Sequence, residues 1–336
     1  MNTRNALMVG MGILLMGGGL AVALLRPVMP LKAGPMAPAD EFAQDRAPPK
    51  ANIPPFDANR ALKYLEEICA IGTRVSGSKG MEAQQKLLEK HFIAQGAKVT
   101  WQNFEGRQKS SRATTPMANL IASWHPDRAV RVIICAHYDT RPRADQETDR
   151  RKRQEPFLSA NDGGSGAALM MEMARHLKEL PCELGIDLVL FDGEEWVLES
   201  EDEYFHGSKH FASEYKKKKG AGKVRYRSAV LLDMIAGKTP AFPVEQNSWW
   251  QAAPLVEEIY GIAIELGATC FQPQKFSTTP VLDDHVPLGQ AGIPAIDIID
   301  FDYPHWHKVS DTPENCGPEG MNQVARVLLV WLQRAR

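Results

Sequence analysis

The sequence lacks the features that would place it in several common classes of protein. Its five cysteines, spread over 336 residues, include no CxxC pair and no tight spacing, which excludes a disulfide-dense scaffold and a thiolate zinc knuckle. One cysteine pair stays compatible with an oxidising compartment, but the sequence does not identify it. Neither sign of charge dominates, since 39 Lys and Arg face 41 Asp and Glu, so there is no global electrostatic case for nucleic acid as a partner. No repeat is visible and no oligomeric state is indicated, so partners must be argued from local sites.

A long uncharged segment stands near the N-terminus. Residues 6–25 carry no charge and are bracketed by Arg4 and Arg26. This length just spans a hydrocarbon core of about 30 Å, and flanking cations are typical of a bilayer segment. We therefore predict a signal anchor within residues 1–26, or alternatively a signal peptide cut after the small-residue pattern Ala21–Ala23. Both predict an exported protein, either membrane-anchored with an extracytoplasmic domain or, if the leader is cleaved, secreted or periplasmic.

The rest of the chain divides into a linker and one large domain. Residues 27–55 carry eight prolines in 29 positions, which predicts an extended linker with little packing. Within residues 56–336, apolar runs predict strands at 97–104, 118–124, 130–136, 186–192, 229–235 and 294–299. Helices are predicted after an N-cap at Asp57 and at about 81–95, 164–179, 207–218, 250–266 and 319–335. This alternation predicts a three-layer α/β/α domain with a mixed, mostly parallel central sheet.

Residues of metal-ligand type follow the apolar strands. Ligands bind beyond the carboxyl ends of strands in such sheets, and five places there or in loops carry carboxylates or imidazoles: His137–Asp139, Asn161–Gly163, Asp192–Glu195, Asp233 and His307. Carboxylates and imidazoles without cysteine are the ligand set of catalytic zinc sites. One aspartate at a strand end is more often a turn or cap residue. Five such places together favour a metal site.

The adjacent Glu194 and Glu195 add a physical argument. Two neighbouring carboxylates repel each other unless a cation holds one of them, and a metal ion supplies that charge. The other carboxylate is then free to move protons with a tuned pKa.

At the level of motifs, the chain resembles the superfamily of zinc aminopeptidases and glutaminyl cyclases. The segments AHYDT, ANDGGSG, FDGEE, LLDMI and WHKVSDT occur in its order and spacing, and the resemblance covers about residues 57–336. It implies that Asp162, Glu195 and His307 bind the principal zinc ion and that Glu194 is the general acid and base.

The two-metal aminopeptidases of this superfamily imply a second zinc site. Carried over to this chain, His137 and Asp233 would bind the second zinc, and Asp162 would bridge the two ions. Asp139 would then orient His137.

Other details are more similar to the glutaminyl cyclases, which convert an N-terminal glutamine to pyroglutamate. Asp283 stands where aminopeptidases usually have a small polar residue, and Trp306 directly precedes His307. The resemblance implies that Asp233 and Asp283 form an acidic network that supports proton transfer by Glu194. It also implies that Trp306 packs against the aliphatic stem of the substrate.

The sequence leaves three hypotheses open. The favoured one is a cyclase with one zinc ion, acting on a peptide or small glutaminyl substrate with a free N-terminus. The second is an aminopeptidase with one or two zinc ions, because ANDGGSG has the aminopeptidase form and a second cyclase tryptophan is absent, with only Trp196 nearby. Asp233 decides between them: directed toward zinc it indicates a peptidase, and joined with Asp283 it indicates a cyclase. The third is a catalytically inactive binding ectodomain.

Overall fold

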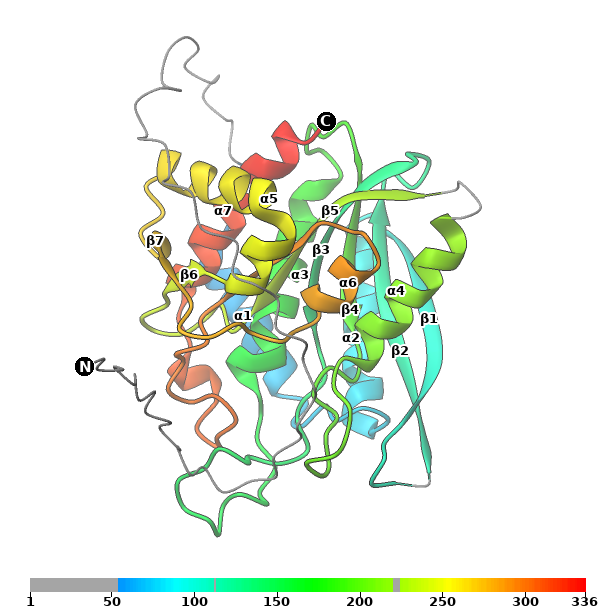
Figure 1. Ribbon diagram of the computed structural model, residues 1–336, viewed down its shortest axis with the longest axis vertical. Coiled ribbons are helices and arrows are strands. Elements are labelled where there is room, and N and C mark those ends of the chain that lie inside the picture. Colours follow the sequence, from blue (N-terminus) through cyan, green and yellow to red (C-terminus); the bar gives the residue numbers. More distant parts are fainter. Residues whose placement is uncertain (1–53, 112, 220–223) are drawn as a thin grey trace, which may run out of the picture.

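A six-stranded sheet forms the centre of the domain. The computed structural model describes residues 54–111, 113–219 and 224–336 (Figure 1). The strands lie in the order β1-β2-β4-β3-β5-β8, with bounds Lys98–Arg107 (β1), Thr114–Trp124 (β2), Val130–His137 (β3), Gly185–Phe191 (β4), Arg225–Asp233 (β5) and Ala295–Ile299 (β8). β2 pairs antiparallel with both β1 and β4, whereas β4, β3, β5 and β8 run parallel to one another. The sheet is therefore mixed and mostly parallel, as predicted.

Helices cover both faces of this sheet (Figure 1). Their bounds are Ala58–Cys69 (α1), Lys79–Ala94 (α2), Ser165–Leu177 (α3), His206–Lys219 (α4), Gln246–Glu265 (α5), His285–Gln290 (α6) and Pro318–Arg334 (α7). Successive residues of β3 point into different cores: Ile134 packs with residues of α1, α2, α3, α5 and α7, and Ile133 packs with residues of α4 and α6. The predicted three-layer α/β/α architecture is confirmed.

The observed helices and strands differ from the predicted ones at some ends, and the shortest observed elements were not predicted. β5 stops at Asp233, not at residue 235, because Met234 turns the chain into the left-handed region with φ 47°. The sequence missed α6 and a small parallel sheet of β6 (Phe242–Val244) and β7 (Phe271–Phe276). These three elements are only three to six residues long and each contains a proline, so they carry little periodicity.

The N-terminal predictions fall on residues that the structure does not describe. The predicted signal anchor at 6–25 and all but the last two residues of the linker at 27–55 lie before residue 54. Among residues 54–336, apart from the short gaps, no helix has both the length and the apolar character that a membrane span requires.

All five cysteines are buried and carry free thiols, so the cysteine pair that the sequence left open is not formed. Burial raises the pKa of Cys69 to about 11 and that of Cys270 to about 11. Thiols with such values stay protonated near neutral pH and pack as small apolar groups.

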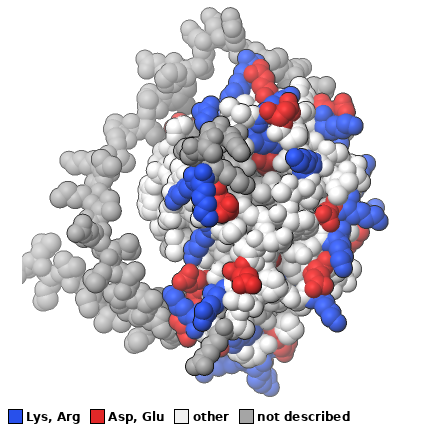
Figure 2. Space-filling model, turned by 90° about the vertical axis from the view of Figure 1, so that its right-hand side faces the viewer, with Lys and Arg blue, Asp and Glu red and all other residues white. Residues whose placement is uncertain are grey.

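Exposed ion pairs contribute less to the stability of the domain than the few buried ones. On the face shown in Figure 2, basic and acidic side chains are interspersed among uncharged surface. Exposed pairs such as Arg334 and Glu265, whose side chains are 32% and 45% exposed, contribute about 0–1 kcal/mol. By contrast, Arg131 at the start of β3 binds Asp187 of β4 with distances of 2.6 and 2.8 Å, and both side chains are almost fully buried.

Removing the buried Arg131 should therefore destabilise the domain. In an Arg131→Met variant the Asp187 carboxylate stays buried without its cation, so we expect the free energy of unfolding to fall by roughly 3–5 kcal/mol. Urea unfolding of chelator-treated protein measures this, with Arg334→Ala as the exposed control, expected to lose under about 1 kcal/mol. Equal losses in the two variants would contradict the greater contribution expected of the buried ion pair.

Candidate active site

The site lies at the carboxyl ends of the parallel strands. β3 ends at His137, β5 ends at Asp233, and the turn Asp192–Glu195 directly follows β4. Because β4, β3 and β5 are neighbours in the sheet, the strand order alone brings these three points together. The remaining residues come from loops: Asp162 lies in the irregular turn Ala160–Gly164 before α3, with non-helical φ and ψ of −81° and 118°, and His307 follows β8.

Asp162, Glu195 and His307 converge as predicted. Each offers one ligand atom, and the three atoms lie within 4.8 Å of one another. His307 Nε2 is 3.0 Å from Glu195 Oε2 and 3.5 Å from Asp162 Oδ2. Both carboxylate oxygens are buried without a hydrogen-bond partner. Buried, unpartnered oxygens that face an imidazole nitrogen fit a bound divalent cation, and this donor set is one that zinc prefers.

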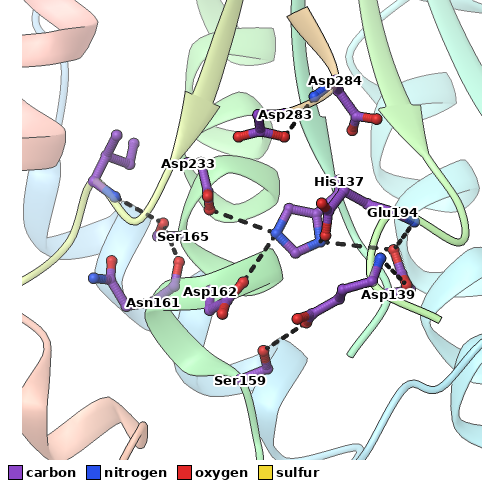
Figure 3. Close-up of polar contacts among 12 residues, drawn as sticks. His137, Asp139, Ser159, Asn161, Asp162, Ser165, Glu194, Asp233, Asp283 and Asp284 are labelled. Atoms are coloured by element: carbon purple, nitrogen blue, oxygen red, sulfur yellow. Dashed lines mark hydrogen bonds and ion pairs between the residues drawn. The ribbon is translucent and has the colours of Figure 1, made fainter. Parts of the chain in front are cut away.

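A second group shares Asp162 with the first. His137 Nε2 lies 3.1 Å from Asp162 Oδ1 and 3.5 Å from Asp233 Oδ1, and all three residues offer ligand atoms within 4.8 Å (Figure 3). The donors implied for a second metal are therefore in place, with Asp162 between the two groups.

Asp139 holds the turn that carries both glutamates. Its carboxylate accepts hydrogen bonds from the backbone N–H groups of Glu194 and Glu195 at 3.0 and 3.3 Å, and Oδ1 lies 3.6 Å from His137 Nδ1 (Figure 3). The predicted contact with His137 is thus present, and the contact with the two backbone N–H groups was not foreseen. Close approach also explains Gly163, since a Cβ there would stand 2.4 Å from the Asp139 carbonyl oxygen.

Backbone strain concentrates around the same place. Within the described residues, five non-glycine residues have positive φ, and four of them border the site: Ser159, Phe205, Met234 and His307. Such conformations cost roughly 1–3 kcal/mol each and persist where the surrounding contacts impose them. Met234 directly follows Asp233, and His307 is itself a candidate ligand.

Glu194, Asp283 and Asp233 are acidic residues of the site, and each has a raised pKa. Burial raises the pKa of the Glu194 carboxyl well above its usual range, and the nearby Asp283 and Glu195 raise it further. Burial and the charge of Asp233 do the same to the pKa of Asp283. Asp233 Oδ1 lies 3.5 Å from His137 Nε2, and the charge of Asp233 also acts on Asp283, so its position serves either of the two roles that the sequence left open.

A cavity of about 390 Å³ opens onto these groups. Glu194 and Asp283 are among its acidic lining residues, and its apolar lining consists of Tyr204, Phe205, Val281, Leu282, Ile299, Phe301 and Trp306. The Trp306 ring lies 4.2 Å from the His307 ring, centroid to centroid, at 31°. Trp196, by contrast, is buried against His206 and does not line this cavity. Tyr204 and Phe205 occupy the wall near the Glu194–Glu195 turn instead.

Several residues of the site escaped sequence reasoning. Arg141 and Asp145 line the cavity, and nothing in their spacing distinguished them from other loop charges. Asp311 is fully buried and accepts from the backbone N–H groups of Asn161 and Asp162 at 2.9 and 3.2 Å, which fixes the ligand-bearing turn. Burial, together with the Asp162 charge, raises the pKa of Asp311 to about 7. Asp311 lies in the segment WHKVSDT, and this position was the feature of the sequence that could have identified it as part of the site.

Known proteins share this architecture. Residues 119–332 match peptidase family M28. The crystal structure of a glutaminyl cyclase from Fimbriiglobus ruber is 48% identical, covers 87% of this chain and 100% of its own, and superposes with a TM-score of 0.83. A Zn-dependent exopeptidase from Parabacteroides distasonis is 29% identical, with 84% and 99% coverage and a TM-score of 0.78. A glutaminyl-peptide cyclotransferase from Boiga irregularis is 26% identical over 77% of this chain and 76% of its own. The chain therefore belongs to peptidase family M28, on its glutaminyl cyclase branch.

Proposed function

We propose that the protein is a zinc-dependent glutaminyl-peptide cyclotransferase, which converts the N-terminal glutamine of a peptide to pyroglutamate and releases ammonia. The observation that carries the proposal is the place of Glu194. Its carboxylate lines the cavity beside the donor group of Asp162, Glu195 and His307 but belongs to neither group of candidate ligands. The 48% identity to a glutaminyl cyclase over nearly the whole domain supports the same conclusion.

Each of these residues has a separate role in the proposed reaction. A zinc ion bound by Asp162, Glu195 and His307 would polarise the γ-carbonyl group of the substrate as a Lewis acid. Glu194 takes a proton from the substrate's α-amine, whose nitrogen then forms a bond to the carbonyl carbon of the side-chain carboxamide. The bond between that carbon and the amide nitrogen breaks, and Glu194 returns its proton to the departing nitrogen, which leaves as ammonia.

No water molecule is consumed in this reaction, so the site needs no hydroxide nucleophile. Burial, followed by the charge of Asp233, raises the pKa of Asp283, so this acidic pair holds a proton beside Glu194 and supports the transfer. Trp306 offers a ring face to the aliphatic stem of the glutamine side chain.

We infer one zinc ion per chain. Burial raises the pKa of Asp233 and the charge of Asp162 raises it further, although His137 opposes the shift. A carboxyl group that keeps its proton is a poor metal ligand, since metals bind the deprotonated form. The alternative, an aminopeptidase with two zinc ions, is favoured by the His137–Asp162–Asp233 group.

Product analysis distinguishes these functions. Purified protein incubated with a glutaminyl peptide should release ammonia and leave every peptide bond intact, and it should not release aniline from amino-acid anilides. A chelator should stop the reaction and added zinc should restore it. Aniline release without ammonia would select the peptidase. Neither activity in protein that binds no zinc would select the inactive ectodomain, although all candidate ligands and Glu194 are in place.

The cellular location is a proposal that rests on residues 6–25 alone. We propose that this segment exports the domain and tethers it to a membrane, so that catalysis takes place outside the cytoplasm. Fractionation tests this: the full chain should sediment with membranes, whereas a variant that lacks residues 1–26 should remain in the cytoplasmic fraction.

A further inference from the structure

The segment Arg141–Glu147, which follows β3, contacts the His307 segment at three points. Asp145 Oδ1 lies 3.0 Å from His307 Nδ1, and the backbone N–H of Gln146 donates to the carbonyl oxygen of His307 at 3.2 Å. Two residues beyond Asp145, the Glu147 carboxylate accepts a hydrogen bond from the backbone N–H of Val309 at 3.0 Å. One side-chain contact and one backbone contact thus hold His307, whose φ of 52° is unfavourable for histidine, and the third contact holds Val309 two residues further along.

The side-chain contact determines what the His307 ring can do. An ionised carboxylate only accepts hydrogen bonds, so Nδ1 must carry the proton that it gives to Asp145. In the neutral ring Nε2 then keeps its lone pair, and Nε2 is the atom that faces Glu195 Oε2 at 3.0 Å. A carboxylate behind a metal-binding histidine fixes both the tautomer and the ring orientation and makes the ring a stronger ligand.

Asp145 is itself held by Arg141. The guanidinium Nη2 lies 2.8 Å from Asp145 Oδ2 and 3.1 Å from the hydroxyl oxygen of Tyr204. The backbone N–H of Arg141 donates to Glu195 Oε1 at 2.8 Å. Because a guanidinium stays charged at any physiological pH, its 2.8 Å contact is a charge-assisted hydrogen bond that holds the Asp145 carboxylate in place. Arg141 therefore touches one candidate ligand, Glu195, directly and reaches another, His307, through Asp145.

We propose that Asp145 is a positioning residue for the metal ligand His307 and that Arg141 fixes Asp145 in that role. The inference rests on the proposed metal site only in that His307 must bind zinc. It assigns no contact with substrate to Asp145, whose effect passes through the imidazole.

The chain offers a closely matched control. Asp149 lies on the same loop, its side chain is 38% exposed like that of Asp145, and it pairs with Arg151 at 2.9 Å. It lines no part of the cavity and touches no candidate ligand. Asp145→Ala, Asp145→Asn and Asp149→Ala should therefore separate a specific role from a general effect of lost loop charge.

Zinc affinity is the decisive measurement, taken by competition with a chromophoric chelator. We expect Asp145→Ala to weaken zinc binding by roughly 10–100-fold, the range known for carboxylates behind metal-binding histidines. Asp145→Asn keeps an acceptor oxygen and should lie between Asp145→Ala and the parent protein, while Asp149→Ala should match the parent. The unfolding temperature of the zinc-free proteins should be the same in all four, and excess zinc should restore turnover of Asp145→Ala.

Two results would overturn the inference. If the parent protein binds zinc and Asp145→Ala binds it equally tightly, Asp145 does not position His307, although the proposed function stands. If the zinc-free Asp145→Ala protein unfolds at a clearly lower temperature than Asp149→Ala, its role is structural. A parent protein that binds no zinc would refute the proposed function together with this inference.

Discussion

Replacing Glu194 by glutamine should reduce kcat by roughly 10²–10⁴-fold while zinc stays bound. Glutamine has nearly the same shape but cannot take a proton from the substrate amine. Glu194 contributes no atom to either group of candidate ligands, so the metal content should not change. Its raised pKa, caused by burial and by Asp283 and Glu195, suits a group that accepts and returns a proton near neutral pH.

The neighbouring glutamate provides the sharpest comparison. Glu195→Gln changes the same functional group one residue away, but Glu195 Oε2 faces His307 and is a candidate ligand, so this variant should lose zinc affinity. Glu199→Gln, on the exposed part of the same loop, should change neither property. Steady-state ammonia release and zinc content per chain separate the three outcomes. Full turnover in Glu194→Gln would refute the assignment of the general acid and base.

The fold and part of the site could be predicted because they depend on local pattern. The apolar run of β3 identifies a buried strand, and its last residue, His137, must then lie at the carboxyl edge of the sheet. The same argument places Asp233 and the Glu194–Glu195 turn. Asp162 and His307 lie in loops, where no periodicity fixes position. Residue type marked them as candidates, and the resemblance to a superfamily assigned them to one metal ion.

The contacts that position the ligands could not be predicted. Asp145 meets His307 across 162 positions of the chain, and Asp311 meets the Asp162 turn across 149. Such pairings are a result of loop packing, and an acidic residue in a loop looks the same in sequence whether it is exposed or supports a ligand. Trp196 is the tryptophan close in sequence to the absent cyclase tryptophan, but proximity in sequence could not show that its ring is buried against His206 and does not line the cavity.

Asp162 and Asp233 give the last and largest contrast, because Asp162 belongs to both groups of candidate ligands and Asp233 only to the second. Asp162→Ala should weaken zinc binding by more than about 100-fold, beyond the effect known for carboxylates behind a ligand, and abolish ammonia release. Asp233→Asn should keep one zinc ion per chain and lose turnover. A fall from two ions to one in Asp233→Asn would establish the two-metal arrangement and favour the peptidase.

The zinc-free proteins provide the control for folding. The Asp162 charge raises the pKa of Glu195, after burial, so the two carboxylates repel each other when no cation stands between them. Removing Asp162 relieves this repulsion but also removes its contacts with His137 and His307, so each zinc-free protein serves as its own baseline. The parent alone should gain stability when zinc is added, by mass action. Thermal unfolding with and without zinc measures both the baselines and this gain. If zinc raises the unfolding temperature of Asp162→Ala as much as that of the parent, the metal binds elsewhere, and the proposed site is wrong.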